Sequence, residues 1–233
     1  KKETEEKDKI FTQMMHSHDP EEVWELLKTH VANAQTSVCS FVLNQYNHIL
    51  NGLLNENFSE LNSVQKELAN KQEELKRLRR KEFLSMRRIP RDIAIERNTW
   101  FHLGVNSNKQ YIYCLIRILE PAKEHVDNHF NPLPEPYRIE FKAFQERINE
   151  LMKQTATMLE RKDFEGYKDV LREADLYKDE LSALRKNLIE RLHHSEDSSL
   201  YNILQVYLNL VQESQELLSI MRHQLRATQK LLA

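Results

Sequence analysis

Glycine is nearly absent from this chain. Its 233 residues include only Gly52, Gly104 and Gly166, against an ordinary usage of about 7%. Few glycines mean few tight turns, because glycine adopts the backbone angles of such turns most readily. Charged residues make up 30% of the chain, with both signs interleaved, which is typical of long helices with a solvated face. The sequence therefore predicts an all-α protein.

Six segments carry apolar residues at helical spacing, and several begin with a recognisable cap. Asp19, followed by Pro20, is the predicted cap of the first helix, and Asn57 of the second. Ser107 and Asp163 are the predicted caps of the third and fifth helices. We expect helices over residues 20–54, 58–86, 108–129, 136–161, 164–194 and 196–233.

Two segments depart from the helical pattern. Residues 1–18 are expected to form a linker and a short helical lead-in, because they open with KKETEEKDK. Residues 87–106, which contain Pro90 and Gly104, are expected to be irregular. The chain does not begin with methionine, so we expect it to be a piece of a longer protein.

The two halves of the chain become similar when one is shifted by 106 residues. Within residues 58–79, seven pairs are then identical: Phe58/Phe164, Val64/Val170, Glu67/Glu173, Glu74/Glu180, Leu75/Leu181, Leu78/Leu184 and Arg79/Arg185. Prolines at 132, 134 and 136 separate the halves. We expect two tandem antiparallel three-helix bundles, residues 19–131 and 132–233, related by a pseudo-two-fold internal repeat. Chance similarity between amphipathic helices is the alternative.

Composition narrows the function classes. A net charge of −2 argues against nucleic acid as a partner. Cys39 and Cys114 stand apart in apolar stretches, which fits a reducing compartment. The sequence has no phosphate-binding glycine loop, nucleophile elbow or paired-histidine zinc motif. We therefore expect a protein without catalytic activity and without an organic cofactor.

A pair of histidines near the middle of the chain is a candidate metal site. His125 and His129 stand one helical turn apart, with Glu124 and Asp127 beside them. On a continuous helix, this spacing lets both imidazoles reach one ion. The alternative is a polar helix end, because the helix dipole favours histidine at a C-terminus.

The fifth predicted helix carries two pairs of carboxylates, each pair separated by three residues. These pairs are Glu165 with Asp169, and Asp175 with Asp179. Two carboxylates one turn apart share a helix surface and can bridge a hard cation through oxygen. A solvated helix face is the alternative, because a helical chain with this much charge produces such pairs by accident.

A basic run, KRLRRKEFLSMRRIPR, closes the second predicted helix and includes Arg87, Arg88 and Arg91. These arginines are candidates for contact with a partner or with anionic lipid headgroups, where each cation contributes about 1 kcal/mol. The alternative is ordinary complementation of the helix dipole at a C-terminus.

Two features resemble a known family. Tandem three-helix bundles with E/D-x-x-x-D on the fifth helix resemble the PhoU family of phosphate-signalling proteins. YCLIR from Tyr113, EPAKEHVDNH from Glu120 and NPL from Asn131 are similar to the C-terminal PhoU-like cytoplasmic extension of some bacterial inorganic phosphate transporters. In the PhoU family, E/D-x-x-x-D motifs hold multinuclear metal clusters on both bundles.

The resemblance implies a divalent or iron-type metal at the four carboxylates of the fifth helix. In the first half, however, Ala69 and Glu73 stand opposite Asp175 and Asp179, which favours a metal-free interaction domain. The resemblance then implies a non-catalytic regulatory or accessory domain at the cytoplasmic face of the inner membrane. Its partner would be the transmembrane permease part of the same polypeptide. A helical scaffold or coiled-coil adaptor unrelated to phosphate is the rival reading.

Overall fold

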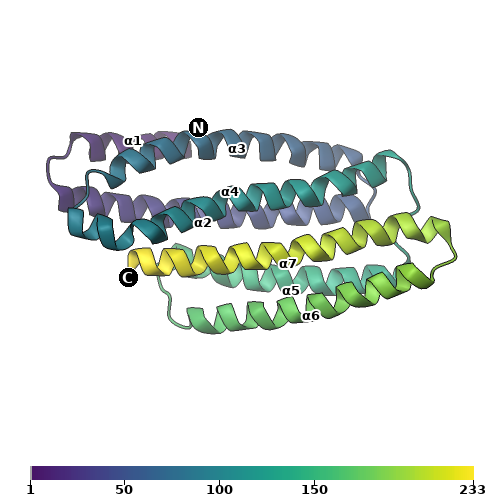
Figure 1. The fold of residues 1–233 in the computed structure, drawn as a ribbon. Coiled ribbons are helices and arrows are strands. Elements are labelled where there is room, and N and C mark those ends of the chain that lie inside the picture. Colours follow the sequence, from purple (N-terminus) through teal and green to yellow (C-terminus); the bar gives the residue numbers. More distant parts are fainter. Residues whose placement is uncertain (1) are drawn as a thin grey trace.

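The chain is all-α in the computed structural model, which describes residues 2–233 and their side chains from Glu5 onward. Within these residues there is no strand, so the predicted fold class is confirmed. The helices are α1 (Lys2–His16), α2 (Pro20–Leu54), α3 (Phe58–Met86), α4 (Arg91–Asp127), α5 (Glu135–Arg161), α6 (Tyr167–His194) and α7 (Ser198–Leu232). All run nearly along the long axis of the molecule (Figure 1).

Local capping fixes the beginnings of α2 and α3 as predicted. The Asp19 carboxylate accepts the N–H of Glu21 at 3.0 Å, and the Asn57 side chain accepts the N–H of Glu60 at 3.1 Å. The predicted start at Asp163 is wrong. Gly166 adopts a left-handed conformation with φ of 77° and interrupts the helical backbone, so α6 begins after it.

Two segments expected to be linker or irregular are helical. Residues 2–16 form α1, which packs on α2 and α3 through the buried side chains of Phe11 and Met14. Residues 91–106 belong to α4, which begins after Pro90. The predicted irregularity is wrong there because Gly104 lies inside the helix on a buried face, next to Gln35 of α2.

The helices form four layers (Figure 1). The layers are α1 with α3, then α2 with α4, then α5 with α7, and finally α6. Contacts between α4 and α7 and between α2 and α5 join the two inner layers. One apolar core runs through both predicted halves, and their predicted border lies in the connection between α4 and α5. Their description as two separate bundles stays a prediction.

The helix bounds and the burial pattern favour duplication. Shifted by 106 residues, α4 would span 197–233, and α7 spans Ser198–Leu232. Twelve of the thirteen buried positions of α4 are also buried in α7 at this shift, Val126 being the exception. Chance similarity between two amphipathic helices would not by itself produce this shared burial pattern, because burial depends on the neighbouring helices as well as on the sequence.

We predict opposite effects of alanine at two helical glycines. A Cβ at Gly52 would lie 2.7 Å from Cδ2 of the fully buried Leu61, so Gly52→Ala should destabilise the fold by about 1–2 kcal/mol. A Cβ at Gly104 would come no closer than 3.5 Å to Gln35 Nε2. Gly104→Ala should therefore stabilise the protein by up to about 1 kcal/mol through helix propensity. Urea unfolding would measure both, and equal effects of the same sign would contradict the packing described here.

Candidate functional site

The two histidines of the predicted metal site do not share a helix. Helix α4 ends at Asp127, and His129 lies beyond it in the left-handed conformation, with φ of 54°. The prediction of one-turn spacing is therefore wrong. His125 is only 2% exposed, and its Nε2 lies 3.0 Å from the backbone oxygen of Asn131. The N–H of Phe130 bonds to the backbone oxygen of His125 at 3.2 Å, so these residues form the terminating turn of α4.

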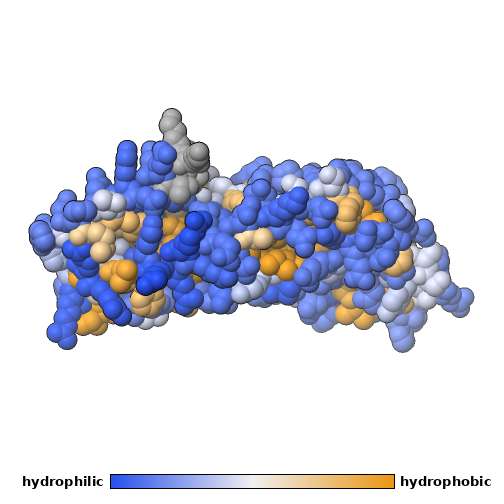
Figure 2. Space-filling view, turned by 90° about the horizontal axis from the view of Figure 1, so that it is seen from above, coloured by the Kyte–Doolittle hydropathy of each residue, from blue (hydrophilic) through white to orange (hydrophobic). Residues whose placement is uncertain are grey.

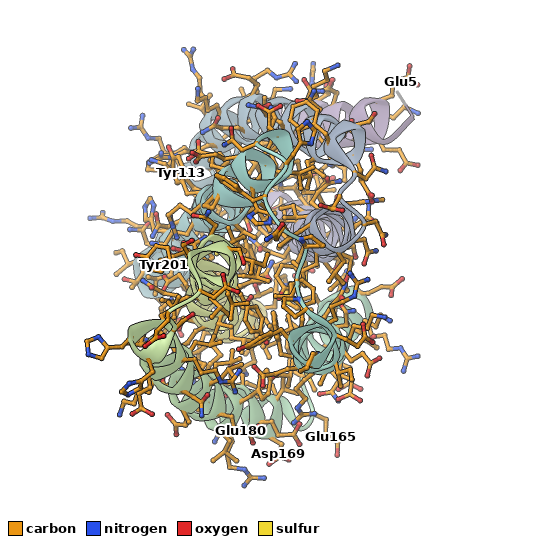
Figure 3. All side chains as sticks on the ribbon, turned by 90° about the vertical axis from the view of Figure 1, so that its right-hand side faces the viewer. Glu5, Tyr113, Glu165, Asp169, Glu180 and Tyr201 are labelled. Atoms are coloured by element: carbon orange, nitrogen blue, oxygen red, sulfur yellow. The ribbon has the colours of Figure 1, made fainter. Side chains whose placement is uncertain are left out.

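The four predicted carboxylate ligands also lie apart. Glu165 precedes the helix, and both Glu165 and Asp169 point outward from the α6 side of the bundle (Figure 3). Asp169 pairs with Arg172, whereas Asp175 pairs with Arg222 of α7 at 2.6 Å. Asp179 is exposed on α6. Among the side chains described, no three His, Cys, Asp or Glu residues are placed to hold a metal ion.

The Asp175–Arg222 pair has a structural consequence. Arg222 forms an ion pair with Asp175 through Nη2, and its Nε donates to the backbone oxygen of Leu171 at 3.1 Å. Both acceptors belong to α6, while the guanidinium belongs to α7. Asp175 therefore helps to hold these two helices together.

The three arginines proposed to contact a partner have different environments. Arg88 donates to the backbone oxygens of Met15 at 2.6 Å and of Ser17 at 2.8 Å. It therefore fixes the C-terminal end of α1 against the α3–α4 connection. Arg87 and Arg91 are exposed, and neither makes an ion pair with any side chain from Glu5 onward.

Exposed apolar side chains accompany the two exposed arginines. Phe83 and Leu84 of α3 are 40% and 45% exposed, and Ile95 of α4 is 71% exposed. We call Phe83, Leu84, Arg87, Arg91 and Ile95 the α3–α4 corner. Figure 2 shows apolar surface among hydrophilic atoms toward this end of the molecule. Cations beside exposed apolar groups are typical of surfaces that bind anionic membranes or protein partners.

Sequence reasoning identified the basic half of the corner and missed the apolar half. Ile95 lay in the segment assigned as irregular, so no helix face was attributed to it. The available signal was its spacing from Arg91, which is one helical turn. Contact across the helix pair is visible only in the structure, where the rings of Phe83 and His102 lie 4.9 Å apart.

No helix in the described part of the chain is long and apolar enough to cross a membrane. No known protein family, curated protein or solved structure matches this chain. Fold and surface together define an all-α bundle with an exposed basic and apolar corner at one end of its α3–α4 pair.

We predict that His125 makes the fold sensitive to acid. Burial lowers the pKa of His125, and the bond to the Asn131 carbonyl opposes that effect only in part. The neutral ring therefore stabilises the fold above its unfolded pKa of about 6.5, and this contribution is lost as pH falls through the lower folded pKa. The free energy of unfolding should decrease less between neutral and acidic pH in His125→Phe than in the parent.

The exposed His129 supplies the control for this measurement. His129→Asn keeps a residue that tolerates the left-handed conformation, and it should retain the pH dependence of the parent. Urea unfolding at several pH values would compare the three proteins. Identical pH dependence in His125→Phe and the parent would contradict the assignment.

Proposed function

We propose that this chain is a non-catalytic regulatory or accessory domain of an inorganic phosphate transporter. In this proposal it lies at the cytoplasmic face of the inner membrane, joined to the permease part of the same polypeptide. The resemblance of the stretch from Tyr113 to Leu133 to transporter extensions supports the link to phosphate. The observation that carries the proposal is the α3–α4 corner, because it offers the surface chemistry that contact with a membrane protein and its lipids requires.

Several contacts hold the corner in one conformation. Ile89, in the connection itself, is buried in the apolar cluster around Trp24 and Phe101. Arg88 ties the same connection to the end of α1. The exposed groups of the corner are therefore presented on a rigid support, so little conformational entropy is lost when a partner binds.

A tethered domain can regulate without chemistry. Attachment to the permease gives the domain a high effective concentration at the inner face of the membrane. Weak contacts then shift the conformational equilibrium of the transporter, provided that they differ between its two states. The signal read by such a domain and the direction of its effect are separate questions from this docking.

A helical adaptor unrelated to phosphate is the second candidate. Exposed apolar residues on α5 and α6, among them Ile139 and Leu176 at 64% and 58% exposure, favour it. These residues lie on the layers opposite α3, so they offer a different face to a protein partner. The full-length gene separates the two candidates: several apolar segments of about 18 residues or more encoded upstream would support the transporter domain.

Vesicle binding tests the corner. We expect the chain to bind phosphatidylglycerol vesicles and not phosphatidylcholine vesicles, as measured by co-sedimentation. Each cation near an anionic surface contributes about 1 kcal/mol, so Arg87→Gln with Arg91→Gln should weaken binding by about 30-fold. Lys168→Gln with Lys186→Gln is the matched control, because it removes the same charge from exposed positions on α6. Equal weakening by both double variants would show that binding depends only on the net charge of the chain, and it would contradict specific binding at the α3–α4 corner.

Transport itself provides the second test. Deleting residues 1–233 from the parent transporter should leave an inserted permease whose phosphate uptake differs in rate or in its response to phosphate supply. Charge reversal at Arg87 and Arg91 should reproduce part of this change without unfolding the domain, because both side chains are exposed. Arg88 is left intact in this experiment because it anchors α1. Uptake like that of the parent in both phosphate-rich and phosphate-poor medium would defeat the regulatory proposal.

A further inference from the structure

A cavity of about 300 Å³ opens between α2, α3 and α4, near α1. Apolar side chains from all three long helices line part of it, including Val38, Leu75 and Ile112. Its size lies at the lower end of the range for small-molecule pockets. The space therefore suits one small molecule, and neither a folded partner nor a helix of another protein fits within it.

Two carboxylates at the cavity already have protein partners. Glu74 accepts from Lys7 at 3.1 Å and from Lys71 at 3.0 Å. Partial burial acts to raise the pKa of Glu74, but the two ammonium groups outweigh it and lower the pKa, so this residue is ionised. Glu82 is buried and lies 2.9 Å from Nε2 of the buried His30. The charge of Glu74 is therefore compensated by two lysines, and Glu82 is hydrogen-bonded to His30.

Three further cations surround the opening. Lys76, Arg79 and Lys109 line the cavity and are exposed, and Lys76 pairs with Glu73 of its own helix at 2.8 Å. Arg79 and Lys109 make no ion pair with any side chain from Glu5 onward, and Lys109 instead lies over the ring of Tyr113, with Nζ 5.6 Å from its centroid. Tyr113 stands on the outer surface of this half of the molecule (Figure 3). The excess of positive charge favours an anionic ligand.

A polar atom beside the cavity has no hydrogen-bond donor. Asn108 lines the cavity and is only 6% exposed, and its Oδ1 is shielded from solvent and accepts no hydrogen bond within the described chain. Leaving a buried polar atom unpaired is costly.

In the second half of the chain, the equivalent positions are joined by hydrogen bonds between two helices. At the shift of 106 residues, Ser182 and Gln215 stand where Lys76 and Lys109 stand in the first half. Gln215 Nε2 donates to Ser182 Oγ at 2.5 Å and to the backbone oxygen of Lys178 at 3.0 Å. These bonds join α6 to α7, whereas Lys76 of α3 pairs with Glu73 within its own helix and Lys109 of α4 lies over Tyr113.

The position equivalent to Asn108 differs in the same sense. Ser214 occupies it, and its Oγ forms a hydrogen bond of 2.8 Å with the hydroxyl of Tyr46. The polar group that is satisfied in the second half is therefore unsatisfied in the first. At all three positions the two halves differ in the same way. In the second half, Ser182, Gln215 and Ser214 form hydrogen bonds between helices. In the first half, the equivalent residues are two lysines and an asparagine whose side-chain oxygen has no donor.

We propose that this cavity binds a small phosphate monoester that also carries hydroxyl or amino groups, of the sugar-phosphate or nucleoside-monophosphate class. A phosphate monoester is close to a dianion at neutral pH, which suits the two cations Arg79 and Lys109 better than the single charge of a carboxylate does. Arg79 offers the planar donor fork that matches phosphate oxygens. The organic part lies against the apolar wall that Val38, Leu75 and Ile112 line. This inference does not rest on the proposed function.

Calorimetry of the full chain with ribose 5-phosphate, adenosine 5′-monophosphate, adenosine and inorganic phosphate tests the proposal. We expect at least one ester to bind about tenfold more tightly than inorganic phosphate, because inorganic phosphate leaves the apolar wall uncovered. Adenosine should not bind at up to about 1 mM. Failure of both esters would overturn the proposal. Equal affinity for inorganic phosphate would overturn the role assigned to the organic part.

The residues at the equivalent positions of the second half suggest the variant that tests the site most directly. Lys76→Ser with Lys109→Gln installs the pair that joins α6 to α7, so we expect loss of ester binding by more than about tenfold together with a higher melting temperature. The rise in melting temperature shows that the variant is folded. Lys168→Gln with Lys186→Gln is the control and should bind the ester as the parent does. Ester binding unchanged in the Lys76/Lys109 variant would overturn the assignment of the site.

Discussion

The buried contact between α4 and α7 is the constraint on which the rest of the structure depends. The hydroxyl of Tyr111 donates to Gln224 Oε1 at 2.7 Å, and Gln224 Nε2 donates to Gln35 Oε1 at 2.8 Å. Three helices from both halves thus share one network inside an apolar core. Because a buried polar group is costly unless its partner is in place, α2, α4 and α7 have one favoured register.

Local interactions explain what the sequence predicted well. The caps at Asp19 and Asn57 act on amides within three residues, so they are recognisable without tertiary information. For residues 1–18 the sequence predicted only a linker and a short helical lead-in, because Phe11 and Met14 gain their burial from α2 and α3. The environment of Arg88 was missed for a similar reason, since its acceptors lie more than seventy residues away in the chain.

The candidate sites show the same limit. The histidine pair failed because one residue, His129, leaves the helix, and helix ends are set by a few backbone angles that apolar spacing does not reveal. The cavity was partly visible in the sequence, because the shift of 106 residues already placed Lys76 opposite Ser182 and Lys109 opposite Gln215. That these positions face each other across a helix pair required the structure, which shows Gln215 bonded to Ser182.

Both proposed activities lie on one helix pair. Helices α6 and α7 are joined by direct hydrogen bonds, whereas α3 and α4 carry the cavity along their length and the exposed corner at their connected end. His102 links the two regions, because it lines the cavity and its ring contacts Phe83 of the corner. An anion bound by Arg79 of α3 and Lys109 of α4 would attract both side chains and draw α3 toward α4. Binding in the cavity would thereby act directly on the spacing of the side chains that form the corner.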